Sequence, residues 1–211
     1  MVYLPHDLIR LHDVTELKDY KQLPDWAQQS LKQAPVVVVR RGPITADGIP
    51  VGIRGAQKAE RAAALLAVRN DYEIVHPKDL VRSQKWQLVA QNRQQLPVFR
   101  ALKLIFPVLA PYEWGIGGSC GYELVTGVPM VNNASDLDVI VTHFPEMTVQ
   151  EANGLLQNLN QFDVHVDLQV TQGQNGFSLE EYANHRSETI LVKTVEGPQL
   201  VSNPWQAIRE K

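Results

Sequence analysis

The sequence is poor in the features that mark several classes of protein. Its one cysteine, Cys120, excludes internal disulfide bonds and any metal site built from several cysteines. There is no run of about 18 apolar residues, and the N-terminus lacks a basic stretch followed by an apolar one. These absences predict a cytoplasmic protein with no signal peptide and no membrane span.

An excess of charge of one sign is also missing. The 20 basic and 23 acidic residues give a formal net charge of -3, which provides no long-range field for binding a nucleic acid. An anion site in this chain must therefore be a local group of Arg and Lys side chains. What is present in quantity is apolar: 44% of the 211 residues are hydrophobic, enough to bury a core in one large domain or two small ones.

Local patterns in the first part of the chain predict a small α/β domain. The β-branched run at residues 36–39 and the segment 49–53 are typical of strands, and the Ala- and Leu-rich residues 57–68 predict a helix. Arg40 and Arg54 stand at strand ends beside glycine turns, where arginine can bind phosphate groups, although solvated surface charges are common there. We place the boundary of this domain after residue 82.

Residues 83–211 predict a second domain with helices and strands in alternation. Residues 86–105 have helical spacing that Pro97 divides into two helices. Residues 137–141 and 164–170 predict strands, and capping boxes at Thr148 and Ser178 each predict the start of a helix. The segments 189–193 and 199–201 predict a hairpin. The fold class is therefore α+β.

Three aspartates fall on the polar faces of the two central strands. In SDLDVIV, Asp136 and Asp138 share one face and lie about 7 Å apart, because side chains alternate along a strand. In VHVDLQV, Asp167 shares its face with His165 and Gln169. If the strands pair, the three carboxylates converge and repel one another, and a divalent cation offsets this repulsion. Mg²⁺ fits such a site, since it takes oxygen ligands and shares them with substrate phosphates.

A glycine-rich turn precedes these strands in the sequence. In Gly117-Gly118-Ser119, the lack of side chains lets backbone N–H groups approach phosphate oxygens, and the serine hydroxyl adds a donor. A turn that binds polyphosphate, followed by aspartates that bind metal, is typical of enzymes that transfer phosphoryl or nucleotidyl groups with two metal ions. Each part alone is most often a plain turn or a solvated strand face, but the order and spacing together favour a site.

These motifs resemble those of the nucleotidyltransferase superfamily with a DNA polymerase β-like core. The resemblance implies a mixed sheet with helices on one side, to which the smaller N-terminal α/β domain is added. Over about residues 36–206 the chain is similar to the phosphoribosyl-dephospho-CoA transferases of malonate decarboxylase. The segments that carry this similarity are WGIGGSCGYELVTGVP, SDLDVIV, DVHVDLQV, FSLEEYA, ILVKT, GPQLVSNPW and RRGPITADGIPVGIRG.

The resemblance implies a reaction and a role for each motif. The prosthetic group 5″-phosphoribosyl-3′-dephospho-CoA would move from 2′-(5″-triphosphoribosyl)-3′-dephospho-CoA to a serine of the apo acyl-carrier subunit of malonate decarboxylase, with release of diphosphate. The N-terminal domain would contact the donor or the carrier, with Arg40 and Arg54 binding substrate. In the second domain, the resemblance implies that Asp136 and Asp138 bind Mg²⁺. Asp167 would be the third carboxylate, which binds a second metal and helps to deprotonate the serine. Gly117, Gly118 and Ser119 would bind phosphate.

Several alternatives stay open at this point. Asp163 is on the same predicted face as Asp167 and could replace it. The carrier could be that of citrate lyase, or the enzyme could transfer a nucleotide from ATP to a protein or small molecule. A non-catalytic binding module and a phosphate-binding structural domain are the other candidates. No nucleic acid or membrane partner is expected.

Overall fold

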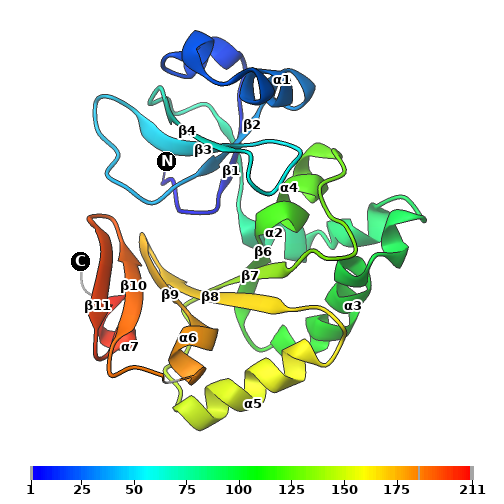
Figure 1. Ribbon diagram of the computed structural model, residues 1–211, viewed down its shortest axis with the longest axis vertical. Helices are drawn as coiled ribbons and strands as arrows, with labels where there is room; N and C mark the ends of the chain where they lie inside the picture. Colours follow the sequence, from blue (N-terminus) through cyan, green and yellow to red (C-terminus); the bar gives the residue numbers. More distant parts are fainter. Residues whose placement is uncertain (1, 185, 210–211) are drawn as a thin grey trace. The chain divides into compact units, whose positions relative to one another are not determined.

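The computed structural model describes residues 2–184 and 186–209. The chain divides into two compact units, Met1–His76 and Pro77–Lys211, and each unit has its own sheet (Figure 1). The position expected for the boundary, after residue 82, falls at the end of the first helix of the second unit, α2 (Pro77–Arg82). In the part of the chain that the structure describes, no helix is both long and apolar enough to cross a membrane.

The first unit is built on an antiparallel sheet with strand order β4-β3-β2-β1-β5. The buried side chains of β2 and β3, together with Leu31 of the helix α1, form its hydrophobic core. Both strands were predicted from their β-branched residues, whereas β1, α1 and β5 were not. The elements are β1 (Leu8–Arg10), α1 (Asp25–Gln33), β2 (Val36–Val39), β3 (Ile49–Arg54), β4 (Arg61–Leu66) and β5 (Glu73–Val75).

The helix predicted for residues 57–68 is wrong. Residues 61–66 form the edge strand β4, which pairs with β3 along its whole length, from Ile49 opposite Leu66 to Arg54 opposite Arg61. Ala62 and Ala64 point to the hydrophobic core of the unit. Alanine favours a helix by less than about 1 kcal/mol per residue, and sheet pairing with burial of alternate side chains outweighs that preference.

The second unit contains a mixed sheet with strand order β11-β10-β9-β8-β7-β6. Only β7 and β8 run parallel, and the other neighbours are antiparallel. The α+β class with a mixed sheet is therefore confirmed. Its strands are β6 (Glu113–Ile116), β7 (Leu137–Thr142), β8 (Val166–Gln172), β9 (Asn175–Ser178), β10 (Ile190–Thr194) and β11 (Gly197–Val201).

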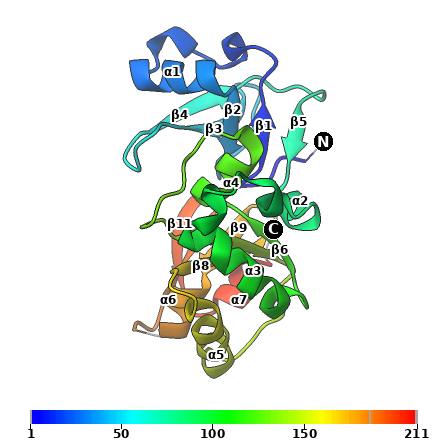
Figure 2. The same ribbon diagram turned by 90° about the vertical axis from the view of Figure 1, so that its right-hand side faces the viewer.

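Helices cover both faces of this sheet, and not one side only as expected. The helix α5 (Val149–Asn160) connects the parallel strands β7 and β8, and it lies with α6 (Leu179–Asn184) on one side of the sheet (Figures 1 and 2). The helix α2 lies on the other face. A Cβ built on Gly115 of β6 would overlap the carbonyl carbon of Pro77, the first residue of α2. Gly115 pairs with Ile140, so α2 is on the face that also carries Asp138.

The segment 86–105 contains one helix where two were predicted. Short 3-10 helices at Lys85–Leu88 and Arg93–Gln95 replace the first. Pro97 is the first residue of α3 (Pro97–Leu109), which continues past Pro107. Proline is favoured at the first helical position because the N–H that it lacks has no partner there, so Pro97 starts the helix and does not divide one.

The local signals of the second unit are otherwise confirmed. Thr148 caps α5, with its side chain and that of Glu151 bonded reciprocally to backbone N–H groups. The hairpin β10–β11 and the strands β7 and β8 lie where the sequence predicts them. The strands β6 and β9 were missed, because four-residue strands with glycine give little periodic signal.

The packing of α2 on β6 gives a first prediction. Gly115→Ala should lower the free energy of unfolding by about 1–3 kcal/mol, since the new methyl group meets rigid backbone. Gly154→Ala, in α5 with open space at its Cβ, should instead stabilise the protein by up to about 1 kcal/mol. Urea denaturation of the two variants measures both effects. Equal stabilities would show that α2 does not pack against Gly115.

Candidate active site

The Gly-Gly-Ser turn stands at the start of a helix. Gly117 is the N-cap of α4 (Gly118–Thr126), and Gly118 has a left-handed φ of 59°. A glycine N-cap offers no side-chain acceptor to the first N–H groups, which point out of the helix. These groups and the positive end of the helix dipole form a place that suits an anion such as phosphate.

The turn lies directly on the carboxylate of Asp138. A Cβ built on Gly118 would overlap Asp138 Oδ2, and the backbone N–H of Gly117 donates to the carbonyl oxygen of Asp138 at 2.9 Å. Only a residue without a side chain can occupy position 118 in this arrangement. The phosphate-binding candidate and the metal-binding candidate of the sequence analysis are therefore in contact.

Asp167 lies beside Asp138 on the neighbouring strand. The two residues are partners in the parallel β7–β8 ladder, so their side chains leave the same face of the sheet. Both are half-buried. The side-chain amide of Gln169 lies 3.2 Å and 3.4 Å from the two oxygens of Asp167. The pairing of the two strands, on which the predicted site depends, is thus present.

The other acidic candidates lie outside the two strands. Asp136 immediately precedes β7 and is half-buried. Asp163 is exposed, has a left-handed φ of 59°, and belongs to the turn before β8, so the strand alternation does not reach it. His165 also precedes β8 and pairs with Glu180 at 3.3 Å.

A ready-made cluster of metal ligands is absent from residues 2–184 and 186–209, where no three His, Cys, Asp or Glu side chains are grouped to hold an ion. The side-by-side pair Asp138 and Asp167 fits a less complete site. Mg²⁺ is commonly bound through one or two carboxylates, several waters and substrate phosphates. The carboxylate oxygens of this pair lie next to the phosphate-binding turn and suit such an ion. These residues do not form a preformed site of three carboxylates.

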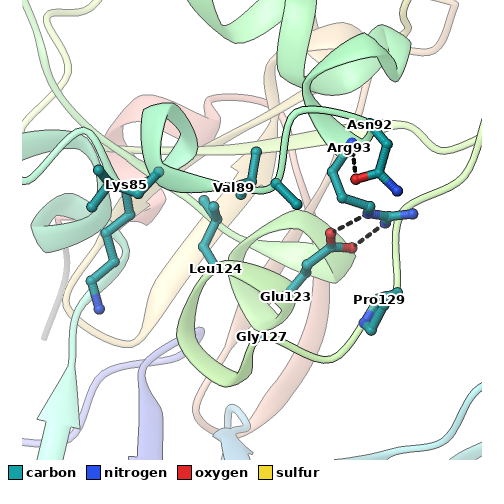
Figure 3. A pocket seen from close by; sticks show the side chains of 10 residues that line it. Lys85, Val89, Asn92, Arg93, Glu123, Leu124, Gly127 and Pro129 are labelled. Atoms are coloured by element: carbon teal, nitrogen blue, oxygen red, sulfur yellow. Dashed lines mark hydrogen bonds and ion pairs between the residues drawn. The ribbon is translucent and has the colours of Figure 1, made fainter.

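A buried ion pair joins α4 to the segment that leads to Asp136. Glu123 is 5% exposed and accepts two hydrogen bonds from Arg93, at 2.9 Å and 2.7 Å (Figure 3). It also accepts from the backbone N–H groups of Met130 and Val131. Arg93 in turn donates to the carbonyl oxygen of Val131. Nothing in the spacing of the sequence links residue 93 to residue 123, so this pair becomes visible only in the structure.

A hollow of about 580 Å³ lies beside this ion pair, around the C-terminal half of α4 (Figure 3). Its walls include Lys85, the exposed Leu88, Leu124 and Pro129. None of the residues predicted for the active site lines it.

Cys120 lies in the first turn of α4 and is completely buried. Burial raises the pKa of its thiol well above the usual value, and the charges of Glu123 and Asp138 raise it further. A thiol held in its protonated form is a poor nucleophile. Cys120 is therefore a small core residue and not a candidate nucleophile.

Arg40 and Arg54 both belong to the first unit. Arg40 follows β2, is exposed, and packs its aliphatic part near Gly52. Arg54 is the last residue of β3 and is half-buried. Their predicted role in binding substrate stays a prediction.

Two family models cover nearly the whole chain. The phosphoribosyl-dephospho-CoA transferase MdcG N-terminal domain matches residues 4–77, and the C-terminal domain of the same family matches residues 79–204. The chain belongs to the phosphoribosyl-dephospho-CoA transferase family. The predicted resemblance is thereby confirmed, and with it the assignment to the transferases.

Individual relatives are similar over nearly their full length. A phosphoribosyl-dephospho-CoA transferase of Pseudomonas syringae pv. tomato is 35% identical over 97% of this chain and 94% of its own. Transferases of the same name from Klebsiella pneumoniae and Pseudomonas fluorescens are each 34% identical, over 95% and 96% of this chain. No solved structure gives a significant match.

The contact between the turn and Asp138 gives a second prediction. Gly118→Ala should abolish most of the transferase activity, because its methyl group displaces the Asp138 carboxylate. Gly127→Ala is the matched control, since Gly127 also has a positive φ but has open space at its Cβ. Both variants carry the strain of a left-handed alanine, about 1–2 kcal/mol. Equal activities in the two variants would contradict a functional contact at Gly118.

The buried ion pair gives a third prediction. Arg93→Met leaves the Glu123 carboxylate buried without its charged partner, and should lower the free energy of unfolding by about 3 kcal/mol. Arg209→Met removes the half-exposed ion pair with Glu146, and it should change the free energy of unfolding by less than about 1 kcal/mol. Urea denaturation compares them. A small loss at Arg93 would mean that water satisfies Glu123 equally well.

Proposed function

We propose that this protein transfers 5″-phosphoribosyl-3′-dephospho-CoA from 2′-(5″-triphosphoribosyl)-3′-dephospho-CoA to a serine of the apo acyl-carrier subunit of malonate decarboxylase, with release of diphosphate. The observation that carries the proposal is the contact between Gly118 and Asp138, with Asp167 beside them. It brings an anion-binding helix end and two carboxylates together, as transfer of a phosphoryl group requires. Membership of the transferase family supports the choice of donor.

The chain's own residues would act as follows. Backbone N–H groups of Gly118 and Ser119 donate to the β- and γ-phosphate oxygens of the donor. Gly117, whose own N–H group is bonded to the carbonyl oxygen of Asp138, binds substrate by leaving room for these phosphates. The serine oxygen of the carrier forms a bond to the phosphorus next to the ribose, the bond from that phosphorus to the diphosphate breaks, and Asp167 receives the serine proton at a carboxylate oxygen. Asp138 and Asp167 would hold Mg²⁺, with Asp136, directly before β7, as the third ligand that the sequence predicts. The bound ion would neutralise charge on the triphosphate and on the leaving diphosphate.

This arrangement would place the catalytic residues on a core of the polymerase β-like nucleotidyltransferase type. The mixed sheet, the glycine turn before α4 and the acidic residues at β7 and β8 support that assignment. The N-terminal unit would contact the donor or the carrier, and Arg40 and Arg54 would bind donor phosphates. Alanine at either position should then weaken donor binding.

Two related reactions are the competing proposals. The same group could be transferred to the carrier of citrate lyase, or a nucleotide could be transferred from ATP to a protein or small molecule. The names of the relatives favour the dephospho-CoA donor over ATP.

Intact-protein mass spectrometry tests the reaction. Purified apo carrier of malonate decarboxylase, the donor, Mg²⁺ and this protein should give a carrier with the added mass of the prosthetic group. Asp138→Asn should slow the transfer by at least about 100-fold, and chelation of Mg²⁺ should stop it. Asp163→Asn, exposed and outside the strand, is the control and should retain activity.

Parallel reactions separate the alternatives. Transfer only to a citrate lyase carrier would change the acceptor and keep the donor. An adenylyl mark from ATP, with no reaction of the dephospho-CoA donor, would overturn the proposal.

A further inference from the structure

Gln169 is a buried polar residue on the face of the sheet that carries the aspartates. It is 7% exposed and lies in β8 between Ile140 of β7 and Ser178 of β9. Its Nε2 group donates to Asp167, as described above. Its Oε1 atom is buried and has no hydrogen-bond partner among the residues that the structure describes.

An unpartnered buried carbonyl oxygen destabilises a protein, so it needs an explanation. An apolar side chain would fill the position without this penalty, as Leu168 and Val170 do on the other face of the same strand. A carbonyl oxygen is satisfied by an N–H or O–H donor, or by a cation. The free Oε1 of Gln169, fixed by the bond from Nε2 to Asp167, therefore presents an acceptor for a donor group of a ligand.

The order of the strands indicates which part of a ligand arrives there. The phosphate-binding turn follows β6, Asp138 is on the adjacent β7, and Asp167 and Gln169 are on β8, one strand further across the sheet. In the proposed mechanism the β- and γ-phosphates bind at the turn, and the inner phosphorus faces Asp167 of β8, so the group attached to that phosphorus lies on the β8 side. In the proposed donor this group is a ribose, whose hydroxyls are O–H donors.

We propose that Gln169 forms the ribose subsite of the active site, with Oε1 accepting a hydrogen bond from the 2″- or 3″-hydroxyl of the triphosphorylated ribose. This inference rests on the proposed function and adds a specificity-determining residue to it. The residue is too buried for the surface serine of a carrier protein to be its natural partner.

Binding of donor analogues tests this subsite without the carrier and without turnover. Isothermal titration calorimetry with Mg²⁺ compares the donor with analogues that lack the 2″- or the 3″-hydroxyl of the triphosphorylated ribose. The wild-type protein should bind one of the two analogues roughly tenfold or more weakly than the donor, because the loss leaves Oε1 unpaired in the complex.

The variant Gln169→Met removes the acceptor and keeps the length of the side chain. It should bind the donor and both deoxy analogues with affinities within about threefold of one another, because there is no longer an acceptor to leave unpaired. Thr171→Val is the matched control on the same strand. Thr171 is also buried but donates to the carbonyl oxygen of Val141, so this variant should keep the wild-type discrimination.

Each other result has a definite meaning. Equal binding of the donor and both analogues by the wild-type protein would overturn the ribose subsite and leave the proposed transfer intact. Discrimination that persists in Gln169→Met would also overturn it, by showing that another residue binds the hydroxyl. A wild-type protein that binds neither the donor nor the analogues would overturn the proposed function itself.

Discussion

The contact between Gly118 and the Asp138 carboxylate is the constraint around which the second unit is arranged. It requires a helix to begin where β6 ends, without a side chain at its first position, and over the polar face of β7. It brings a carboxylate to the helix end that is also suited to a phosphate. A phosphate bound at the turn would lie next to this carboxylate, and a divalent cation would relieve the repulsion between the two anions. The proposed need for Mg²⁺ thus follows from how closely the turn and the strand approach.

The surrounding residues hold this contact in place from two directions. On the far side of α4, Glu123 accepts hydrogen bonds from Arg93 and from the backbone that leads to Asp136. On the strand side, Gln169 holds Asp167 next to Asp138. The pair of the buried Glu123 with the half-buried Arg93, and the buried amide of Gln169, orient groups that would otherwise rotate freely. Such polar contacts fix geometry more than they add stability.

The sequence predicted the elements that have strong local signals better than those that depend on distant residues. Residues with strong short-range signals were placed correctly: the β-branched run at Val36, the capping box at Thr148 and the alternating strand through Asp167. The predictions failed where residues distant in the sequence determine the local structure or the partner of a side chain. Residues 61–66 form a strand because β3 lies beside them, and the ion pair between Arg93 and Glu123 depends on a fold that brings positions 30 residues apart together.

The burial of Cys120 has a consequence for how the motion of the site can be followed. This thiol lies in the first turn of α4 and is the chain's only one. A thiol reagent can therefore modify only those molecules in which the start of α4 has left the sheet. The rate of modification under native conditions reports how often that opening happens, and a ligand that holds the turn closed slows it. The rate at which Cys120 is modified thus measures the opening of the turn on which the site depends.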